Sequence, residues 1–339
     1  MLKPLIGRVV AGQDLSEAEA EQAMDIIMSG QATPAQIGAF LIALRLKGET
    51  VAEITGLARS MRRQAAALTT HHQVFVDTCG TGGDGSQTFN ISTTAAFVIA
   101  GAGVAVAKHG NRSVSSRCGS ADMLEALGVR VDLPPVALAR CLDEVGMAFL
   151  FAPVFHGAMK HAAGPRREIG TRTVFNLLGP LTNPAGAPCQ LVGVYEPSLT
   201  ETVAAVLARL GSRRAYVVHG DDGLDEITTT GPTKISYLDN GRISTCTFTP
   251  EEAGLARASL QHLIGGAAAD NAAIALAVLK GAKGPARDIV LLNAAFGLLA
   301  AGKEKSLAGA MAAATASIDS GAALAKLQAM TTWIESWAA

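Results

Sequence analysis

Charged and aromatic residues are both scarce in this chain. Of its 339 residues, 17% are Asp, Glu, Lys or Arg and 4% are Phe, Trp or Tyr, whereas hydrophobic residues make up 49%. The core must therefore consist mainly of Ala, Val, Leu and Ile, as in a globular rather than a disordered protein. The chain is too long for one ordinary core, so we expect two packed regions, one of them discontinuous in sequence.

Several features of exported, membrane-bound or nucleic-acid-binding proteins are missing. The formal net charge is -1, and no run of Lys and Arg is long enough to bind a polyanion or a membrane surface. The five cysteines are scattered without a C-x-x-C pair, which argues against a zinc site or a redox couple. The start of the chain lacks a signal pattern, and the apolar run 95–107 is shorter than a membrane span. We therefore expect a reduced cytoplasmic protein with neither nucleic acid nor membrane among its partners.

The first 70 residues have the pattern of successive helices. A hydroxyl residue is followed three positions later by Glu or Gln at three places: Ser16 with Glu19, Thr33 with Gln36, and Thr50 with Glu53. Each pair is a capping box, in which side chains and backbone N–H groups at a helix start satisfy one another. Apolar residues at helical spacing follow, so residues 1 to about 70 are predicted to be all-helical.

From residue 74 onward the pattern changes to strand, loop and helix. Short β-branched or aromatic runs occur at residues 74–76, 104–107, 147–151, 191–194 and 215–218, each separated by a segment able to form a crossover helix. This alternation predicts a mainly parallel sheet wrapped by helices. Asn240-Gly241 lies between the runs 235–238 and 243–248, which predicts one antiparallel hairpin.

A glycine-rich loop is the strongest local motif. Residues 77–85 read DTCGTGGDG and directly follow the first predicted strand. Four glycines in six positions allow backbone N–H groups to converge on a phosphate, although a structural glycine-rich turn is the alternative. The motif is neither a Walker A loop nor a G-x-G-x-x-G fingerprint, so the usual nucleotide interpretations do not apply.

Two further motifs follow at the next predicted helix start and strand end. Residues 90–94 (NISTT) offer hydroxyls and backbone donors where a helix begins, either as ordinary N-caps or as a second anion site. Residues 108–117 (KHGNRSVSSR) form either a solvated basic loop or a ligand-binding loop at the end of a strand. Adjacent anion sites suit a pyrophosphate better than a single phosphate.

Acidic and basic residues in the second half add possible contacts to a metal and to a carboxylate. Residues 221–226 (DDGLDE) carry four carboxylates, which could bind Mg²⁺ beside a phosphate site or could cap a helix. Arg166 precedes the segment 171–184 and could pair with a carboxylate or lie in a surface ion pair. His156 and His161 are poorly spaced for chelating one metal, so we interpret them as structural or substrate-contacting.

Taken together, these motifs resemble the anthranilate phosphoribosyltransferase family. The matching segments are residues 80–84 (GTGGD), 89–93 (FNIST), 108–112 (KHGNR), 172–184 (RT to NP) and 222–226 (DGLDE), in order along nearly the whole chain. The glycine-rich loop and the KHGNR motif are shared with pyrimidine nucleoside phosphorylases. The RT to NP segment and the DGLDE loop are specific to the anthranilate enzymes.

The resemblance implies an α/β fold of the nucleoside phosphorylase type. A small all-helical domain, residues 1–70 with 166–186, would be joined to a larger mainly parallel α/β domain, residues 71–165 with 187–339. The active site would lie at the hinge, and the helical domain would form a homodimer. The implied reaction is transfer of the 5-phosphoribosyl group of phosphoribosyl pyrophosphate (PRPP) to the amine of anthranilate, a step of tryptophan biosynthesis.

The resemblance also assigns residues to substrates and to the cofactor Mg²⁺. The PRPP-binding residues would be Gly80, Gly83, Asp84, Thr88, Asn90, Ser92, Thr93, Lys108 and Ser120. Anthranilate would contact Gly80, His109, Asn111 and Arg166, with Arg166 facing its carboxylate, and Mg²⁺ would be held by Ser92, Asp225 and Glu226. No acid–base residue is implied, because an aromatic amine is already unprotonated and catalysis then needs positioning and anion stabilisation.

One departure from the family pattern and two rival functions remain. Where the family commonly has His-Pro-Ala-Met and then Pro-Val-Arg, this chain has His156-Gly157-Ala158-Met159 and Gly164-Pro165-Arg166, so we expect a more mobile anthranilate pocket wall. A pyrimidine nucleoside phosphorylase is the nearest rival, but the metal loop argues against it. The second rival, a non-enzymatic relative that binds nucleic acid, would need a basic surface, and the net charge of -1 argues against it.

Overall fold

The computed structural model describes residues 2–113 and 117–338, and the chain begins with a helical bundle. Its four N-terminal helices are α1 (Lys3–Val10), α2 (Glu17–Met28), α3 (Pro34–Lys47) and α4 (Val51–Gln64). All three predicted capping boxes are confirmed: in each, the hydroxyl accepts from the N3 backbone N–H and the N3 side chain returns the bond. Local sequence therefore sets where α2, α3 and α4 begin.

Within the described residues, seven strands form one sheet. They are β1 (Phe75–Gly80), β2 (Ala105–Gly110), β3 (Met147–Phe151), β4 (Cys189–Gly193), β5 (Arg214–Gly220), β6 (Thr233–Asp239) and β7 (Arg242–Phe248). The spatial order is β3-β2-β1-β4-β5-β6-β7, with parallel pairing from β3 to β5 and antiparallel pairing from β5 to β7. The mainly parallel sheet and the hairpin at Asn240-Gly241 are both confirmed.

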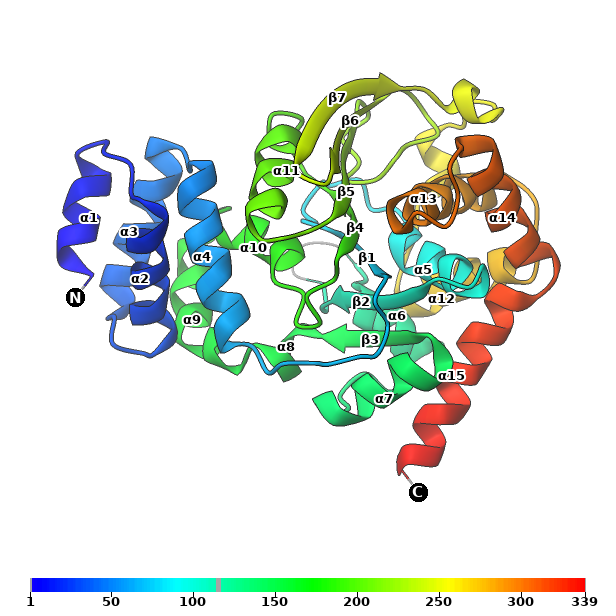
Figure 1. Ribbon diagram of the computed structural model, residues 1–339, viewed down its shortest axis with the longest axis horizontal. Coiled ribbons are helices and arrows are strands. Elements are labelled where there is room, and N and C mark those ends of the chain that lie inside the picture. Colours follow the sequence, from blue (N-terminus) through cyan, green and yellow to red (C-terminus); the bar gives the residue numbers. More distant parts are fainter. Residues whose placement is uncertain (1, 114–116, 339) are drawn as a thin grey trace.

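Helices cover both faces of this sheet (Figure 1). On one face lie α5 (Ile91–Gly101), α13 (Pro285–Ala301) and α14 (Leu307–Asp319), and on the other lies α11 (Leu199–Arg209), which also contacts α4 of the bundle. The remaining helices are α6 (Ser120–Ala126), α7 (Pro135–Val145), α8 (Ala152–Phe155), α9 (Lys160–Ile169), α10 (Phe175–Leu181), α12 (Ala268–Leu279) and α15 (Ala322–Ala338). Short 3₁₀ helices occur at Gly157–Met159, Pro250–Ala253 and Leu260–Leu263.

The core of the bundle contains side chains from a later part of the chain. Val174, Phe175 and Leu178 are buried in the same hydrophobic cluster as Met24 and Phe40 of the N-terminal helices. Figure 1 shows α9 (green) beside the blue helices, and α9 contacts both α2 and α3. The segment that includes α9 and α10 thus packs with the bundle, while the exact division at residues 70, 166 and 186 stays a prediction.

Two strands reach further than their sequence patterns suggested. The first strand runs on through Asp77 to Gly80, and the second through Lys108 to Gly110, so these residues are strand ends and not loop residues as expected. In the segment 171–184, helix α10 includes Gly179-Pro180 and ends at Leu181. In the described part of the chain no single helix is long and apolar enough to cross a membrane. Helices α14 and α15, whose axes are bent by 59° from each other, have the required length and composition only when taken together.

Candidate active site

The sheet reverses its winding order between β1 and β4. The chain passes outward from β1 through β2 to β3 and then returns to the other side of β1 to form β4. Connections from neighbouring strands leave in opposite directions at such a point, so the carboxyl ends of β1 and β4 border a crevice where α/β sheets bind ligands. Gly80 and Gly193 are paired in register at these two strand ends.

Asp225 occupies this crevice because both strand ends are glycine. A Cβ atom at position 193 would lie 1.5 Å from the carbonyl oxygen of Asp225, and one at position 80 would lie 2.2 Å from its Oδ2. The Gly82 N–H donates to the same Oδ2 at 2.8 Å. Gly80 therefore makes room for a carboxylate, a structural role that the sequence pattern did not reveal.

Glu226 lies at the amino end of α5. Its Oε1 accepts a hydrogen bond of 3.0 Å from the Ser92 backbone N–H, in the positive first turn of the helix. The helix begins at Ile91 with Asn90 in the N-cap position and no side-chain cap, so Ser92 and Thr93 are not the N-caps that the alternative interpretation required. The acidic loop and the first turn of α5, 134 residues apart in sequence, therefore form one site.

The buried side chain of Lys108 also belongs to this polar cluster. Its side chain is 2% exposed, and its Nζ donates to the Thr78 carbonyl oxygen and, at 3.4 Å, to Ser92 Oγ. Burial lowers the pKa of Lys108, against the opposing charges of Asp77 and of the two carboxylates Asp225 and Glu226. Because Lys108 lies in β2 and not in a solvated loop, its amino group is a buried cation next to the crevice.

The two carboxylates lie in an environment that favours a bound cation. The pKa of Asp225 is raised to about 6, mainly by burial and secondly by the charge of Asp84. The pKa of Glu226 is raised to about 8, mainly by burial and secondly by the charge of Asp225. Two buried carboxyl groups whose pKa values are raised would both be stabilised as anions by a divalent cation, and oxygen ligands are those that Mg²⁺ prefers. The residues present therefore fit Mg²⁺.

The glycine-rich loop adopts a conformation that needs glycine. Gly82, Gly83 and Gly85 have φ values of 65°, 74° and 77°, and the non-glycine residue Gln87 also has a positive φ of 55°. L-residues rarely adopt such values, and they occur where a backbone must turn sharply around a ligand. Arg172, from the segment before α10, donates to the Gly83 carbonyl oxygen and stacks over Tyr195.

The remaining residues expected to bind PRPP lie around this loop. Asp84 accepts from Ser86 Oγ at 2.5 Å, and Thr88 forms an isolated β-bridge with Ile264. Asn90 Oδ1 accepts from the Asn271 side chain at 2.9 Å, and Thr93 is buried in the first turn of α5. The loop from residue 80 to the start of α5 is thus held from several sides.

The end of β2 leads to the other expected contacts. Ser120 Oγ donates to the Asn111 carbonyl oxygen at 3.1 Å, and the Ser113 and Gly119 N–H groups donate to Asp122. These bonds bring Ser120, at the start of α6, next to Asn111. Residues 114–116 of the motif 108–117 lie outside the described residues.

His109 and His156 form a buried pair between the sheet and α10. Their ring centroids are 5.2 Å apart, His109 Nδ1 lies 3.2 Å from the Gly179 carbonyl oxygen, and the Nε2 atom of each ring is buried without a hydrogen-bond partner in the described residues. Burial lowers the pKa of His109 to about 3 and that of His156 to about 4. Both rings are neutral at pH 7, and each keeps one buried nitrogen that has no hydrogen-bond partner in the described residues.

Arg166 is half-buried on α9 and does not lie in the surface ion pair that was the alternative. Its guanidinium stacks over the Phe175 ring, 4.8 Å from the centroid, and no carboxylate within the described residues pairs with it. Burial lowers the pKa of Arg166. Among the described residues no hydrogen bond joins Arg166 to Asn111 or His109, so their common role stays a prediction. Gly157, the departure from the family pattern, has open space around its Cα.

Sequence reasoning missed two residues that hold this site together. Asn183 donates to Asp77 Oδ2 and to the Ala107 carbonyl oxygen, both at 2.8 Å, and so attaches the segment after α10 to β1 and β2. Arg172 links the segment before α10 to the glycine-rich loop, and its carbonyl oxygen accepts from Arg45 of α3. Both residues belong to a motif of the sequence, but only the fold shows what they contact.

The chain matches two family models that together span most of its length. Residues 3–65 match the helical bundle domain of a glycosyl transferase family, and residues 72–324 match its a/b domain. An anthranilate phosphoribosyltransferase of Moorella thermoacetica is 79% identical over 339 residues, which is 100% of both chains.

Solved structures of the same kind of protein superpose closely. The anthranilate phosphoribosyltransferase of Thermus thermophilus is 46% identical, with a TM-score of 0.93 over 97% of this chain and 99% of that one. The enzyme of Saccharomyces cerevisiae in complex with PRPP and Mg is 28% identical, with a TM-score of 0.90 over 99% and 98% of the chains. The yeast enzyme with 4-fluoroanthranilate gives 27% and 0.89 over the same shares. With its helical bundle, its parallel sheet and its near-complete match to these proteins, the chain belongs to the anthranilate phosphoribosyltransferase family.

Proposed function

We propose that this chain transfers the 5-phosphoribosyl group from PRPP to the amine of anthranilate, giving N-(5-phosphoribosyl)anthranilate and pyrophosphate in tryptophan biosynthesis. The observation that carries the proposal is the placement of Asp225 and Glu226 over the glycine strand ends and the first turn of α5. Relatives with this fold bind PRPP, Mg and an anthranilate analogue.

The site would hold PRPP at the switch point of the sheet. Backbone donors of the glycine-rich loop and the buried cation of Lys108 would bind its phosphates, and Mg²⁺ would be held by Ser92, Asp225 and Glu226. Mg²⁺ supplies charge that stabilises the departing pyrophosphate. Anthranilate would lie toward Asn111, His109 and Arg166, and Arg166 would pair with its carboxylate.

The reaction then needs no side chain to activate the nucleophile. The neutral amine attacks the anomeric carbon while the bond between that carbon and the pyrophosphate oxygen breaks. After the new C–N bond has formed, the amine loses a proton to solvent. The positive charges of Lys108 and of the first turn of α5 stabilise the negative charge that grows on the leaving group. His109 and His156 are neutral at pH 7, so they add no positive charge beside the proposed anthranilate site.

The direct test is to mix the protein with PRPP, Mg²⁺ and anthranilate and follow the loss of anthranilate fluorescence. Thymidine with phosphate is the control substrate pair for a nucleoside phosphorylase. Turnover of anthranilate without phosphorolysis of thymidine is expected. Phosphorolysis of thymidine without consumption of anthranilate would overturn the proposal.

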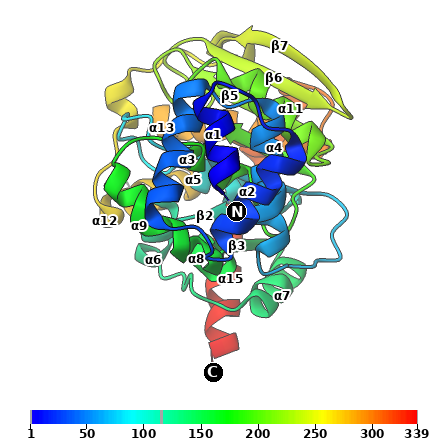
Figure 2. The same ribbon diagram turned by 90° about the vertical axis from the view of Figure 1, so that its left-hand side faces the viewer.

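A homodimer formed through the helical bundle is part of the proposal. Val10 of α1 and Leu46 of α3 are 70% and 82% exposed, and α1 packs beside α3 on the face turned to the viewer in Figure 2. Large apolar side chains on one surface favour association with another copy. Val10→Glu with Leu46→Glu should give a monomer in analytical ultracentrifugation, whereas Val136→Glu, an exposed valine on α7, should leave the dimer intact.

A further inference from the structure

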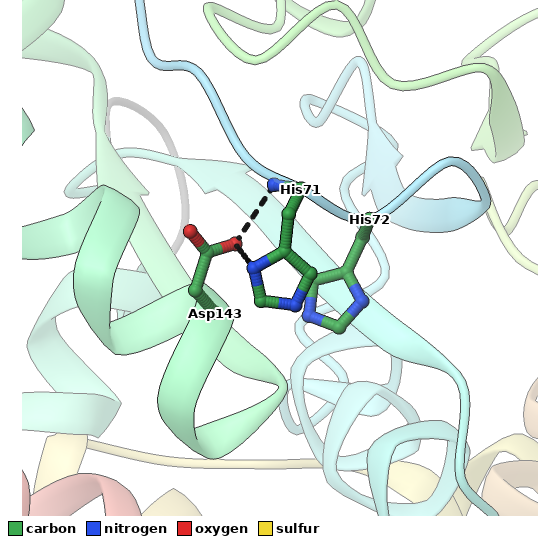
Figure 3. Close-up of side chains that lie close together, drawn as sticks. All are labelled: His71, His72 and Asp143. Carbon is green, nitrogen blue, oxygen red and sulfur yellow. Dashed lines mark hydrogen bonds and ion pairs between the residues drawn. The ribbon is translucent and has the colours of Figure 1, made fainter.

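Two adjacent histidines and an aspartate lie close together at the amino ends of the strands, at the end of the sheet opposite to the active site. His71 and His72 belong to the connection from α4 to β1, and Asp143 lies near the carboxyl end of α7 (Figure 3). These residues precede β1 and β3, so they lie at the amino ends of the strands, whereas Asp225 lies over the carboxyl ends. The established reaction of the family uses none of them.

The three side chains bring ligand atoms together. One ligand atom from each residue lies within 4.8 Å of those of the other two, and His71 Nδ1 is 3.2 Å from Asp143 Oδ1. Neighbouring ligand atoms of a tetrahedral Zn²⁺ with bonds of about 2.0–2.1 Å are roughly 3.3 Å apart. The distance of 3.2 Å between His71 Nδ1 and Asp143 Oδ1 is already close to this value.

Surrounding groups orient these ligands. The Thr70 hydroxyl and, at 3.1 Å, the His71 backbone N–H donate to Asp143 Oδ1, and His72 Nε2 is 3.1 Å from the Leu142 carbonyl oxygen. Outer contacts of this kind fix carboxylate and imidazole ligands and raise metal affinity.

An ion can reach the cluster from solvent. His72 and Asp143 line a cavity of about 480 Å³ that also borders the turn at Val145 and Gly146 before β3. We propose that His71, His72 and Asp143 form a binding site for a transition-metal ion of the Zn²⁺ class, with at least one coordination position open toward this cavity. Two imidazoles and one carboxylate favour Zn²⁺ over Mg²⁺, which prefers oxygen ligands alone.

Such an ion would fasten the connection between α4 and β1 to α7. That connection joins the helical bundle to the sheet and is already held by bonds from Ala66 to Phe155 and from Arg213 to Gln73. Binding to the folded state alone would raise the thermal midpoint, by a few degrees at an ion concentration about 100-fold above Kd.

The test is a calorimetric titration of the full chain with Zn²⁺, in a buffer that contains excess Mg²⁺ and no substrates. A Cys246→Ser background removes the exposed thiol, which could bind Zn²⁺ itself. One equivalent should bind with a Kd in the micromolar range or below. His71→Ala with His72→Ala should weaken binding by at least about 100-fold and Asp143→Asn by about 10-fold. His262→Ala, an exposed histidine elsewhere, should bind Zn²⁺ like the parent.

Each outcome decides the question. Absence of saturable Zn²⁺ binding below about 100-fold over the protein concentration, or unchanged binding by the double histidine variant, would overturn the site. If Asp143→Asn bound Zn²⁺ like the parent, the three-ligand assignment would be wrong. A melting curve without metal establishes that each variant is folded, and His71→Ala alone replaces the double variant if that one is not. The anthranilate assay is not needed, so this test can fail independently of the proposed function.

Discussion

Asp225 lies so close to Gly193 that a Cβ atom on the glycine would be 1.5 Å from the aspartate carbonyl oxygen. No side-chain rotation relieves a clash with backbone, so the loop that carries Asp225 and Glu226 depends on the absence of a side chain at the end of β4. The proposed metal site therefore needs a glycine that binds nothing itself.

Gly193→Ala should displace this loop and destroy the proposed Mg²⁺ site. We expect a loss of at least about 1–3 kcal/mol in the free energy of unfolding, as in other overpacked positions, and a much larger loss of activity. Gly38→Ala is the control, because a Cβ there meets nothing within 4 Å in the middle of α3 and should stabilise by up to about 1 kcal/mol. Wild-type turnover by Gly193→Ala would refute the placement of Asp225.

Asp225→Asn with Glu226→Gln should remove the Mg²⁺ ligands. Turnover should fall by at least about 100-fold, and Mg²⁺ with PRPP should no longer raise the thermal midpoint. Without metal the double variant should be as stable as the wild type, since the amides replace carboxyl groups that resist ionisation. Asp221→Asn, an exposed carboxylate of the same loop, is the matched control and should keep its Mg²⁺ dependence.

Arg166→Ala should weaken anthranilate binding and leave PRPP binding nearly unchanged. A charged hydrogen bond is worth roughly 1.5–3 kcal/mol, which corresponds to about one to two orders of magnitude in affinity. Arg166→Lys keeps the charge without the guanidinium fork and should recover part of the loss. Titrating each substrate at saturation of the other separates the two effects. Weaker PRPP binding with unchanged anthranilate binding would move Arg166 to the phosphate side.

The buried histidines should make the protein acid-sensitive between about pH 7.5 and 5. Their pKa values, about 3 for His109 and about 4 for His156, are below the unfolded value of about 6.5, so the unfolded chain binds more protons. The free energy of unfolding therefore falls as the pH drops below about 6.5, by about 2 kcal/mol per histidine at pH 5.

The measurement is urea unfolding at about pH 7.5 and pH 5.0 for the wild type and His156→Asn. The difference between the two pH values should be about 2 kcal/mol smaller in the variant. His262→Asn, an exposed histidine, should behave like the wild type. An equal pH dependence of His156→Asn and wild type would show that His156 is protonated in the folded state.

Features encoded by neighbouring residues could be predicted from the sequence. The capping boxes at Ser16, Thr33 and Thr50 depend on residues three positions apart, and all three were predicted correctly. The alternation of strands and helices is a local pattern as well and predicted the mainly parallel sheet, and the Asn240-Gly241 pair predicted the hairpin.

Features that depend on remote partners could not be predicted. Asp77 and Lys108 were expected in loops, but both are buried charged residues within strands, where such residues are rare. Asp77 is accommodated in β1 by Asn183, 106 residues away, and Lys108 in β2 by Thr78. The structural role of Gly80 and the contact of Arg172 with Gly83 likewise require the fold.

The burial of Phe175 and Leu178 among the first helices has a consequence for synthesis of the chain. The ribosome completes α4 roughly 110 residues before it adds these side chains, and at roughly 5–20 residues per second the delay is about 5 to 20 seconds. During this time the nascent bundle exposes the apolar surface that α10 later covers. We therefore expect the N-terminal helices to be a site of chaperone engagement on the ribosome.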